Sequence, residues 1–364
     1  MKGVYISTVR VLLIVLMAIF TAVLVLLVKR AHSGVTSPII KERIIEDIYG
    51  RQVSIPEEVD SIVCLKASAI RLVCYAGGAD RICGVEECEL RGAPYTHLFA
   101  NPELRGLKSV GPMMGGDAEL TIIADPDLIF LTCSTPEEAD FIQRRCRVPV
   151  LCLDYGDLWR ERAKFDTSLR IIGEALGTQL RVDSLITYID SQISELERRV
   201  VETNSLKESR GIYVCGISYK GTKGATSTDP YYAALQFLHT PNIASGVDPS
   251  IVSAVNGTIV NLEQVALWNP DVIFVDHDGL NMVMDDLRRI RLDSAELHTI
   301  WPYNNVHSNF EVMLINSWYM GKVLYPDRFK DISIDEKRNE VLDAFLHAPV
   351  GDSLVAAWGE LSKI

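Results

Sequence analysis

The first 32 residues of this 364-residue chain contain no aspartate or glutamate. They hold four of its 36 Lys and Arg residues, so the remainder carries 32 basic against 48 acidic residues and a formal charge of −16. A body this acidic repels phosphate backbones, and we therefore expect no nucleic-acid partner. With 48% hydrophobic and 23% charged residues, the composition excludes a disordered chain.

Residues 11–28 form an apolar run with one polar interruption, Thr21. As a helix this run spans about 27 Å, near the thickness of a membrane's hydrocarbon core. It is long for a signal peptide, although Ala31 and Ser33 stand at a cleavage-like spacing, so we favour an uncleaved anchor over a cleaved signal. The first cysteine is Cys64, which excludes a lipid-modified cysteine directly after the run. Flanking charges nearly balance and slightly favour a cytoplasmic N-terminus, with the acidic body outside the cell.

The short motifs of several enzyme classes are also absent. The chain has neither GxxxxGK[ST] nor GxGxxG, and neither HExxH nor GxSxG. No two of its eight cysteines have CxxC spacing, and no two histidines have the short spacing of a metal site. His277, between Asp276 and Asp278, is the one hint of a bare-ion site. We expect a binding protein without catalytic residues, resident metal or cofactor, and keep a two-lobed enzyme such as a metal chelatase or glycosyl transferase as the alternative.

The body alternates short apolar runs with longer amphipathic ones, which is typical of an α/β protein with parallel sheets. Residues 179–202 keep apolar side chains at helical spacing and, as one helix, are about 36 Å long. They separate two sets of strand-like runs. The first set is residues 61–65, 81–85, 128–132 and 150–154; the second is residues 211–217, 272–276 and 298–301.

An internal repeat supports two lobes of one design. Residues 118–132 (AELTIIADPDLIFLT) match residues 262–276 (LEQVALWNPDVIFVD) at a constant offset of 144. Each copy reads as a helix, a proline-containing turn and a buried strand. We predict two similar parallel-sheet lobes joined by a long helix. The expected divisions are 1–32 for the anchor, 33–165 for the first lobe, 166–204 for the helical region, 205–350 for the second lobe and 351–364 for a tail.

Several short motifs resemble one protein family in order and spacing. They are DIYGRQV at residues 47–53 before the first strand, YAGGAD at 75–80 followed by ICGV at 82–85, the DPD and NPD turns, and GKVLYP at 321–326. Together they resemble the substrate-binding proteins of ABC importers, specifically the helix-linked group that carries iron chelates, haem and cobalamin. Residues 216–229 and 242–244 look like the iron-complex subgroup.

The resemblance implies a two-lobed binding fold, an extracytoplasmic main domain, and an ABC permease with its ATPase as partners. It also implies acidic residues that dock onto the permease, for which Glu86 and Glu87 are candidates. The family's lipid-anchor cysteine is missing, so a membrane helix would tether this chain. A ferric chelate of siderophore type ranks first as cargo and corrinoids second, with haem and other metal complexes open. A receptor or sensor role is disfavoured because about ten residues precede the apolar run.

Ligands of parallel sheets bind beyond the carboxyl ends of the strands, which selects the candidate site residues. We expect ligand contacts from Lys66, Ser68, Met113 and Tyr155 in the first lobe and from Tyr219, Lys220, His277, Tyr303 and Asn304 in the second. Further candidates in the same loops are Met114, Cys133, Ser134, Trp159, Ser218, Asp278, Asn305 and His307. Each of these candidates could instead have a purely structural role. A tyrosine is also well suited to a half-buried rim, and most lysines lie on the solvated surface.

Overall fold

The computed structural model describes residues 41–92, 94–201, 210–217, 223–247, 258–292, 294–303 and 309–364. The chain divides into Met1–Glu42 and a second compact unit, Arg43–Ile364, which contains both parallel sheets. The expected N-terminal anchor lies outside the described residues. Among the residues that are described, no helix has the length and apolar character needed to cross a membrane.

A parallel sheet of five strands, called here the first sheet, organises the N-terminal part of this unit. Its order is β5-β4-β3-β6-β7, with β3 at Ile62–Leu65, β4 at Ile82–Val85, β5 at Lys108–Ser109, β6 at Leu128–Leu131 and β7 at Val150–Cys152. A separate two-stranded sheet, β1 (Glu42–Glu46) and β2 (Gln52–Pro56), precedes it. All residues of β3, β6 and β7 are buried, because helices cover both faces of the sheet.

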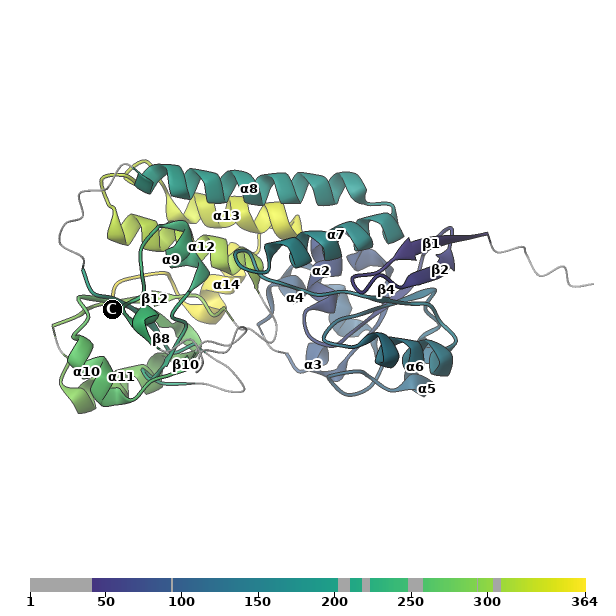
Figure 1. Cartoon of the computed structure of the whole chain (residues 1–364), viewed down its shortest axis with the longest axis horizontal. Coiled ribbons are helices and arrows are strands. Elements are labelled where there is room, and N and C mark those ends of the chain that lie inside the picture. Colours follow the sequence, from purple (N-terminus) through teal and green to yellow (C-terminus); the bar gives the residue numbers. More distant parts are fainter. Residues whose placement is uncertain are drawn as a thin grey trace, which may run out of the picture. The chain divides into compact units, whose positions relative to one another are not determined.

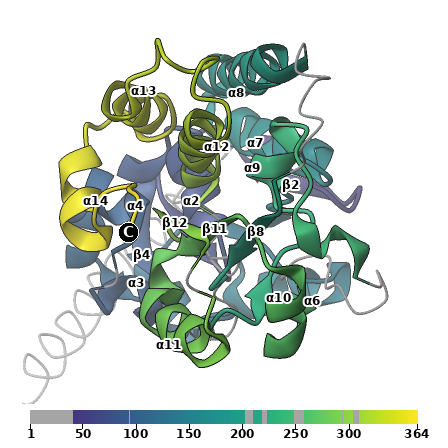
Figure 2. The same cartoon turned by 90° about the vertical axis from the view of Figure 1, so that its left-hand side faces the viewer.

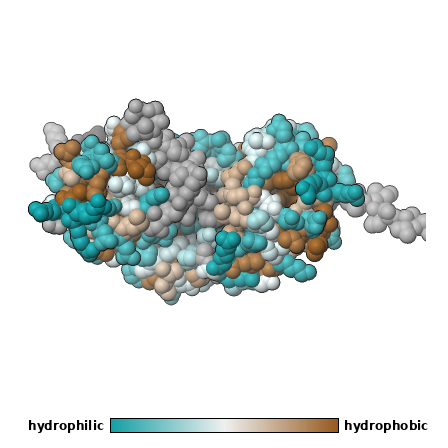
Figure 3. All heavy atoms as spheres, turned by 90° about the horizontal axis from the view of Figure 1, so that it is seen from below, coloured by the Kyte–Doolittle hydropathy of each residue, from teal (hydrophilic) through white to brown (hydrophobic). Residues whose placement is uncertain are grey.

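Alternate residues of these strands enter two different cores. Ile62 and Cys64 face the core that contains α2 (Ala69–Tyr75) and α7 (Arg162–Leu176). Val63 and Leu65 face the core that contains residues of α6 (Pro136–Cys146), which packs beside α5 (Ala118–Ala124). The short helices α3 (Glu87–Leu90) and α4 (Thr96–Ala100) lie between β4 and β5 in the chain. Exposed apolar side chains remain on α5 and α6, and Figure 3 shows hydrophobic patches among polar residues on the face that carries these helices.

The second sheet has three parallel strands in the order β12-β11-β8. They are β8 at Ile212–Cys215, β11 at Val272–Asp276 and β12 at Glu296–Ile300, and Val272 pairs with Ile212 on one side and Glu296 on the other. Figure 2 shows α12 (Phe310–Leu324) and α13 (Ile334–Leu346) on one side of this sheet, and α10 (Leu262–Trp268) and α11 (Leu280–Ile290) on the other. A small antiparallel pair, β9 (Ser227–Thr228) and β10 (Thr258–Ile259), and the helix α9 (Ala233–Phe237) complete this part.

The predicted long helix is α8, Gln179–Val201, and its predicted apolar stripe is buried or partly buried along its whole length. It packs against α7, α9, α12 and α13, as Figure 1 shows for α7 and α13. Residues 351–364, expected as a tail, contain α14 (Gly351–Trp358), and the backbone N–H of Ile364 donates to the carbonyl of Leu297 in β12. The chain end therefore packs on the second sheet. The exact lobe boundaries stay a prediction.

The two repeat copies have the same local structure. The helix in each copy ends at a residue in the left-handed conformation, Asp125 (φ 55°) after α5 and Asn269 (φ 42°) after α10. Two residues later an aspartate fixes the start of the next strand to its neighbour: Asp127 accepts from the Ser61 N–H before β3, and Asp271 accepts from the Gly211 N–H before β8. The sequence repeat therefore reflects one structural solution used in both sheets.

Candidate functional site

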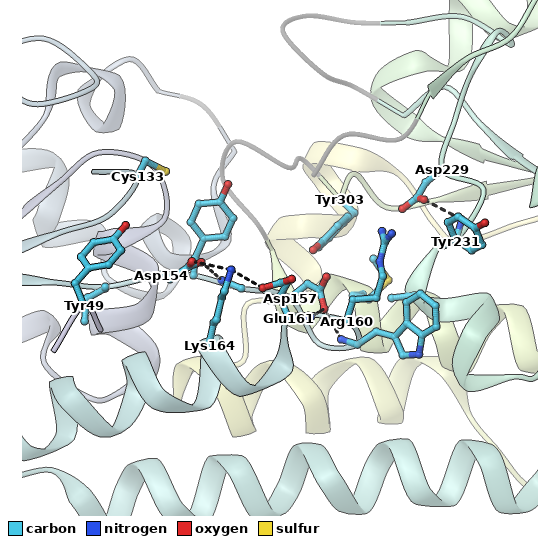
Figure 4. Close-up of a pocket in the computed structure, with 16 residues that line it drawn as sticks. Tyr49, Cys133, Asp154, Asp157, Arg160, Glu161, Lys164, Asp229, Tyr231 and Tyr303 are labelled. Carbon is cyan, nitrogen blue, oxygen red and sulfur yellow. Dashed lines mark hydrogen bonds and ion pairs between the residues drawn. The ribbon is translucent and has the colours of Figure 1, made fainter. Parts of the chain in front are cut away.

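A cavity of about 310 Å³ lies where loops from both sheets meet. Its lining comes from the β1–β2 turn, the loops after β6 and β7, the segment before α9, Tyr303 after β12, and α12 (Figure 4). These loops follow the carboxyl ends of β6, β7 and β12, where ligands of parallel sheets bind. The lining includes Tyr49, Cys133, Asp154, Tyr155, Gly156, Asp157, Trp159, Arg160, Glu161, Lys164, Asp229, Tyr231, Tyr303 and Met313.

The loop after β7 is shaped by local hydrogen bonds. Gly156 has φ +54°, and a Cβ there would collide with the Glu161 carbonyl oxygen and the Phe165 nitrogen, so this position requires glycine. One oxygen of Asp157 accepts from the backbone N–H groups of Trp159 (2.6 Å) and Glu161 (2.9 Å). These bonds hold the turn that presents Trp159 and Arg160 to the cavity.

An aromatic and cationic stack joins this loop to the segment before α9. The rings of Trp159 and Tyr231 are stacked with centroids 6.4 Å apart. The guanidinium carbon of Arg160 lies 5.4 Å from the centroid of each ring. Cation–π contacts of this kind are worth about 0.5–2 kcal/mol. The stack therefore connects residues that follow the first sheet to residues that belong with the second.

The charged residues of the cavity are mostly acidic and make contacts with one another. Lys164 pairs with Glu161 (2.5 Å) and with Asp154 (3.3 Å), as Figure 4 shows. Asp229 accepts from the Tyr231 N–H (2.9 Å), and burial raises the pKa of its carboxyl. Burial also raises the pKa of the Tyr303 phenol. Four carboxylates and two cations make this cavity more suitable for a neutral or cationic group than for a free anion.

The structure brings two of the nine predicted contact residues, Tyr155 and Tyr303, into the cavity lining, together with the further candidates Cys133 and Trp159. Tyr219, Lys220 and Asn304 lie outside the described residues, as do Ser218, Asn305 and His307. The ligand contacts of all nine residues stay predictions.

The remaining predicted contact residues lie elsewhere. Lys66 is turned to an ion pair, with Nζ 2.7 Å from Glu138 and 3.1 Å from the carbonyl of Cys133. Ser68 is buried immediately before α2. Met113 is 41% exposed in the turn before α5, and His277 follows β11 at the start of a short 3-10 helix, His277–Gly279.

The two glutamates considered for permease docking differ. Glu86 is buried. Its carboxylate accepts hydrogen bonds from the backbone N–H groups of Lys66 (3.2 Å) and Gly115 (2.8 Å), and these bonds fix the turn before α5. Glu87 is exposed on α3. Burial raises the pKa of Glu86, as expected for a carboxyl withdrawn from water. Of this pair, only Glu87 has an exposed side chain.

Sequence reasoning missed seven charged or aromatic lining residues: Tyr49, Asp154, Asp157, Arg160, Glu161, Lys164 and Tyr231. The residues from 157 to 164 follow a predicted strand, and that position was the available signal. Tyr49 lies in the β1–β2 turn, and its hydroxyl donates to the carbonyl of Ser134 (2.6 Å). No local sequence pattern predicts that Tyr49 lines the cavity.

Metal-ligating side chains do not gather in the part of the chain that the structure describes. No cluster of three or more His, Cys, Asp or Glu side chains there is placed to hold a metal ion. All eight cysteines are free thiols, and seven of them are buried or half-buried. Cys133 is the exposed one; it has a left-handed backbone (φ 48°) and lies in the loop after β6.

Comparison with known proteins gives a consistent picture. No protein-family model matches the sequence. The molybdate-binding protein MolA of Haemophilus influenzae is 22% identical over 349 residues, which cover 88% of this chain and 95% of MolA. An uncharacterised ABC transporter substrate-binding lipoprotein, YvrC of Bacillus subtilis, is 23% identical over 79% of this chain and 87% of its own.

Solved structures agree with these relatives. A periplasmic solute-binding protein of Veillonella parvula superposes with a TM-score of 0.68 at 16% identity, covering 87% of this chain and 97% of its own. MolA bound to molybdate superposes with a TM-score of 0.63 at 20% identity, covering 84% and 98%. These relatives and neighbours are substrate-binding proteins of transporters and not enzymes. The chain thus has the fold of the periplasmic substrate-binding proteins of ABC importers, the group that its sequence motifs resemble.

Proposed function

We propose that this chain is the extracytoplasmic substrate-binding component of an ABC importer and captures a metal complex in the cavity described above. The observation that carries the proposal is the shared lining: loops of both sheets contribute to one cavity, and the Trp159–Tyr231–Arg160 stack crosses between them. Cargo delivered to the permease and its ATPase is released when such a cavity opens. Because α8 packs continuously along α7, α12 and α13, we expect a small opening movement.

A ferric chelate is our first candidate cargo. Phenols of Tyr49, Tyr155, Tyr231 and Tyr303 surround the cavity, and aromatic rings are common in the lining of small-molecule sites. The cavity volume is at the lower end of the range for ligand pockets, so a chelate of modest size fits best. Corrinoids and haem are larger alternatives. A molybdate-type oxyanion is a second candidate, favoured by the similarity to MolA and disfavoured by the acidic lining of the cavity.

The N-terminal apolar run, residues 11–28, serves in this proposal as the membrane anchor that keeps the binding domain beside the permease. A single uncleaved helix would do the work of the lipid anchor of a lipoprotein such as YvrC. Mass spectrometry of the chain purified from membranes tests this point. The intact N-terminal sequence is expected, and a chain that starts near Ser33 would mean a cleaved signal peptide instead.

Tryptophan fluorescence tests the binding role, because Trp159 is 38% exposed and lines the cavity. The full-length chain in detergent is titrated with ferric citrate, ferrioxamine B, haemin, cobalamin and molybdate. We expect saturable quenching by one of them, without turnover. The variant Trp159→Phe should lose most of the signal while calorimetry shows that it still binds. If calorimetry detects binding of none of the five, the carrier role fails.

A further inference from the structure

A second polar cluster lies away from the cavity lining, at the start of α2 and α12. It consists of Ser68, Arg71, Tyr75 and Glu311, and is called here the Arg71 cluster. Ser68 and Arg71 follow β3, and Glu311 stands in the first turn of α12, after β12. The hydroxyl of Tyr75 donates to the carboxylate of Glu311, so the cluster also joins elements that follow the two sheets.

Arg71 is the unusual member. Its side chain is fully buried, with 0% exposure, and its three guanidinium nitrogens have no hydrogen-bond partner among the described residues. Its guanidinium lies over the face of the Tyr95 ring, whose centroid is 5.0 Å from the guanidinium carbon. Arginine stays charged in proteins, so a proton cannot be released to relieve the cost. A buried charge without a hydrogen-bonded partner is strongly unfavourable.

The acidic residue of the cluster makes no hydrogen bond to this guanidinium. The carboxylate of Glu311 is engaged by Tyr75, and its other oxygen, Oε1, has no hydrogen-bond partner among the described residues. Burial raises the pKa of this carboxyl, and the nearby Arg71 charge acts in the opposite direction. The guanidinium fork therefore lacks a hydrogen-bonded anionic partner from the described protein.

Ser68 adds a second donor that is also unused. Its hydroxyl is buried and has no hydrogen-bond partner among the described residues, and Ser68 is the left-handed N-cap residue of α2 (φ 65°), three positions before Arg71. Its neighbour Ala67 accepts a hydrogen bond from the Thr132 hydroxyl (2.6 Å), and the residue after Thr132 is Cys133 of the cavity lining. One hydrogen bond, between Thr132 and Ala67, therefore connects the residue before Ser68 to the residue before Cys133 of the cavity lining.

We propose that Arg71 and Ser68 form an anion subsite that binds a pair of negatively charged oxygens of the cargo. An arginine fork and a hydroxyl suit a carboxylate or a tetrahedral oxyanion, which the fork grips with two parallel hydrogen bonds. This inference rests on the proposed binding function and makes its cargo anionic at one end. Separation of α2 from α12, which the Tyr75–Glu311 hydrogen bond joins, gives the cargo access to the subsite.

Calorimetry on the full-length chain in detergent separates the possible sources of the oxygens. The probes are molybdate, a free oxyanion; ferric citrate, a chelate with carboxylates; and ferrioxamine B, a cationic ferric chelate. The variants are Arg71→Met, which keeps the length without the charge, and Arg71→Lys, which keeps the charge without the fork. Arg145→Met is the matched control, because Arg145 also lies over an aromatic ring, Phe141 at 5.9 Å, but on the exposed face of α6.

We expect wild type to bind molybdate or ferric citrate, and Arg71→Met to weaken the bound probe about 100-fold, with Arg71→Lys in between and Arg145→Met unchanged. Loss of molybdate binding identifies a free oxyanion, and loss of ferric citrate binding alone identifies a chelate carboxylate. Equal binding of these probes by wild type and Arg71→Met overturns the subsite. So does binding of ferrioxamine B alone, which leaves the proposed function intact. Binding of none of the three probes also overturns the subsite, and the proposed function falls with it only when haemin and cobalamin fail to bind as well.

Thermal unfolding gives a readout that a purely structural arginine would not share. Without ligand, Arg71→Met should unfold at the same temperature as wild type or higher, because it removes a buried charge that has no hydrogen-bond partner among the described residues. The bound anion should raise the unfolding temperature of wild type and not that of the variant. A ligand-free variant that unfolds several degrees below wild type would mean that Arg71 serves the fold, and would contradict the proposal.

Discussion

The charged side chains of the cavity and of the Arg71 cluster differ in their exposure to solvent and in their partners. In the cavity, Lys164 has two carboxylate partners and Arg160 lies over two rings, all within reach of water. In the cluster, Arg71 is out of water and its nitrogens have no hydrogen-bond partner among the described residues. Partnered charges near solvent cost little and say little about function. An unpartnered buried charge costs much, and it therefore points to a group that arrives from outside.

Asp276 extends the comparison to a buried acid, and its pH dependence is the largest effect we predict. This fully buried carboxyl at the end of β11 accepts from the backbone N–H groups of Asp278 (3.0 Å) and Tyr303 (3.2 Å). Burial raises its pKa to about 8. The folded state then keeps a proton that the unfolded state has released, so the stability from this group is complete below about pH 4 and is lost as the pH rises through 8.

The expected slope is a fall of up to about 1.4 kcal/mol in unfolding free energy per pH unit between about pH 5 and 8. Urea unfolding at several pH values measures it, and Asp276→Asn should remove it. Histidines whose burial lowers their pKa, such as His97, act in the opposite direction, but equally in both proteins. The difference between the two slopes therefore isolates Asp276, and parallel slopes would show that the carboxyl is ionised in the fold.

The second effect concerns the stack that crosses the cavity. Trp159→Ala removes a ring that contacts both Tyr231 and Arg160. We expect the affinity for the cargo to fall about 30-fold, since loss of a large aromatic anchor in a binding site typically costs about 2 kcal/mol. Calorimetry measures the change, and Trp159→Phe should stay within about threefold of wild type because a ring remains. Unchanged affinity in Trp159→Ala would place the cargo elsewhere.

The third effect tests the bond that closes the Arg71 cluster. Tyr75→Phe keeps the ring, which packs edge-on against Phe345 at 5.1 Å, but removes the hydroxyl that Glu311 accepts from. Leaving a buried carboxyl without this partner should lower the unfolding free energy by about 1–3 kcal/mol. Urea unfolding measures the loss. Tyr49→Phe is the control, because the Tyr49 hydroxyl bonds the Ser134 carbonyl at an exposed site and should change stability by less.

The smallest predicted effect is the change in unfolding free energy when an exposed ion pair is removed. Arg288 and Asp285 form an ion pair of 2.9 Å on α11, with side chains 70% and 75% exposed. Arg288→Ala should change the unfolding free energy by about 0.5 kcal/mol or less. A loss as large as that in Tyr75→Phe would mean that burial does not separate the two kinds of charge contact in this protein.

Much of the fold was predictable because its signals are local. The strand runs at residues 61–65, 128–132 and 272–276 correspond to β3, β6 and β11, and the long apolar stripe corresponds to α8. β5 escaped prediction because two residues, Lys108–Ser109, carry no periodicity. Of the site, Tyr155 and Tyr303 were accessible to reasoning because each stands shortly after a strand end. Tyr49 was not, since it reaches the cavity from the β1–β2 turn, far from the other lining residues in the sequence.

The sequence by itself determined the alternation of helices and strands, the repeat and the family likeness, because apolar periodicity and turn residues act over a few neighbours in the chain. The tertiary structure alone decided which charges are partnered. Lys66 meets Glu138 from 72 residues away, and Tyr75 meets Glu311 from 236 residues away. Arg71 reads in the sequence as one basic residue among 36, and becomes a candidate anion site only when packing removes it from water without a hydrogen-bond partner among the described residues. Burial depends on contacts between distant segments, and a local pattern does not contain them.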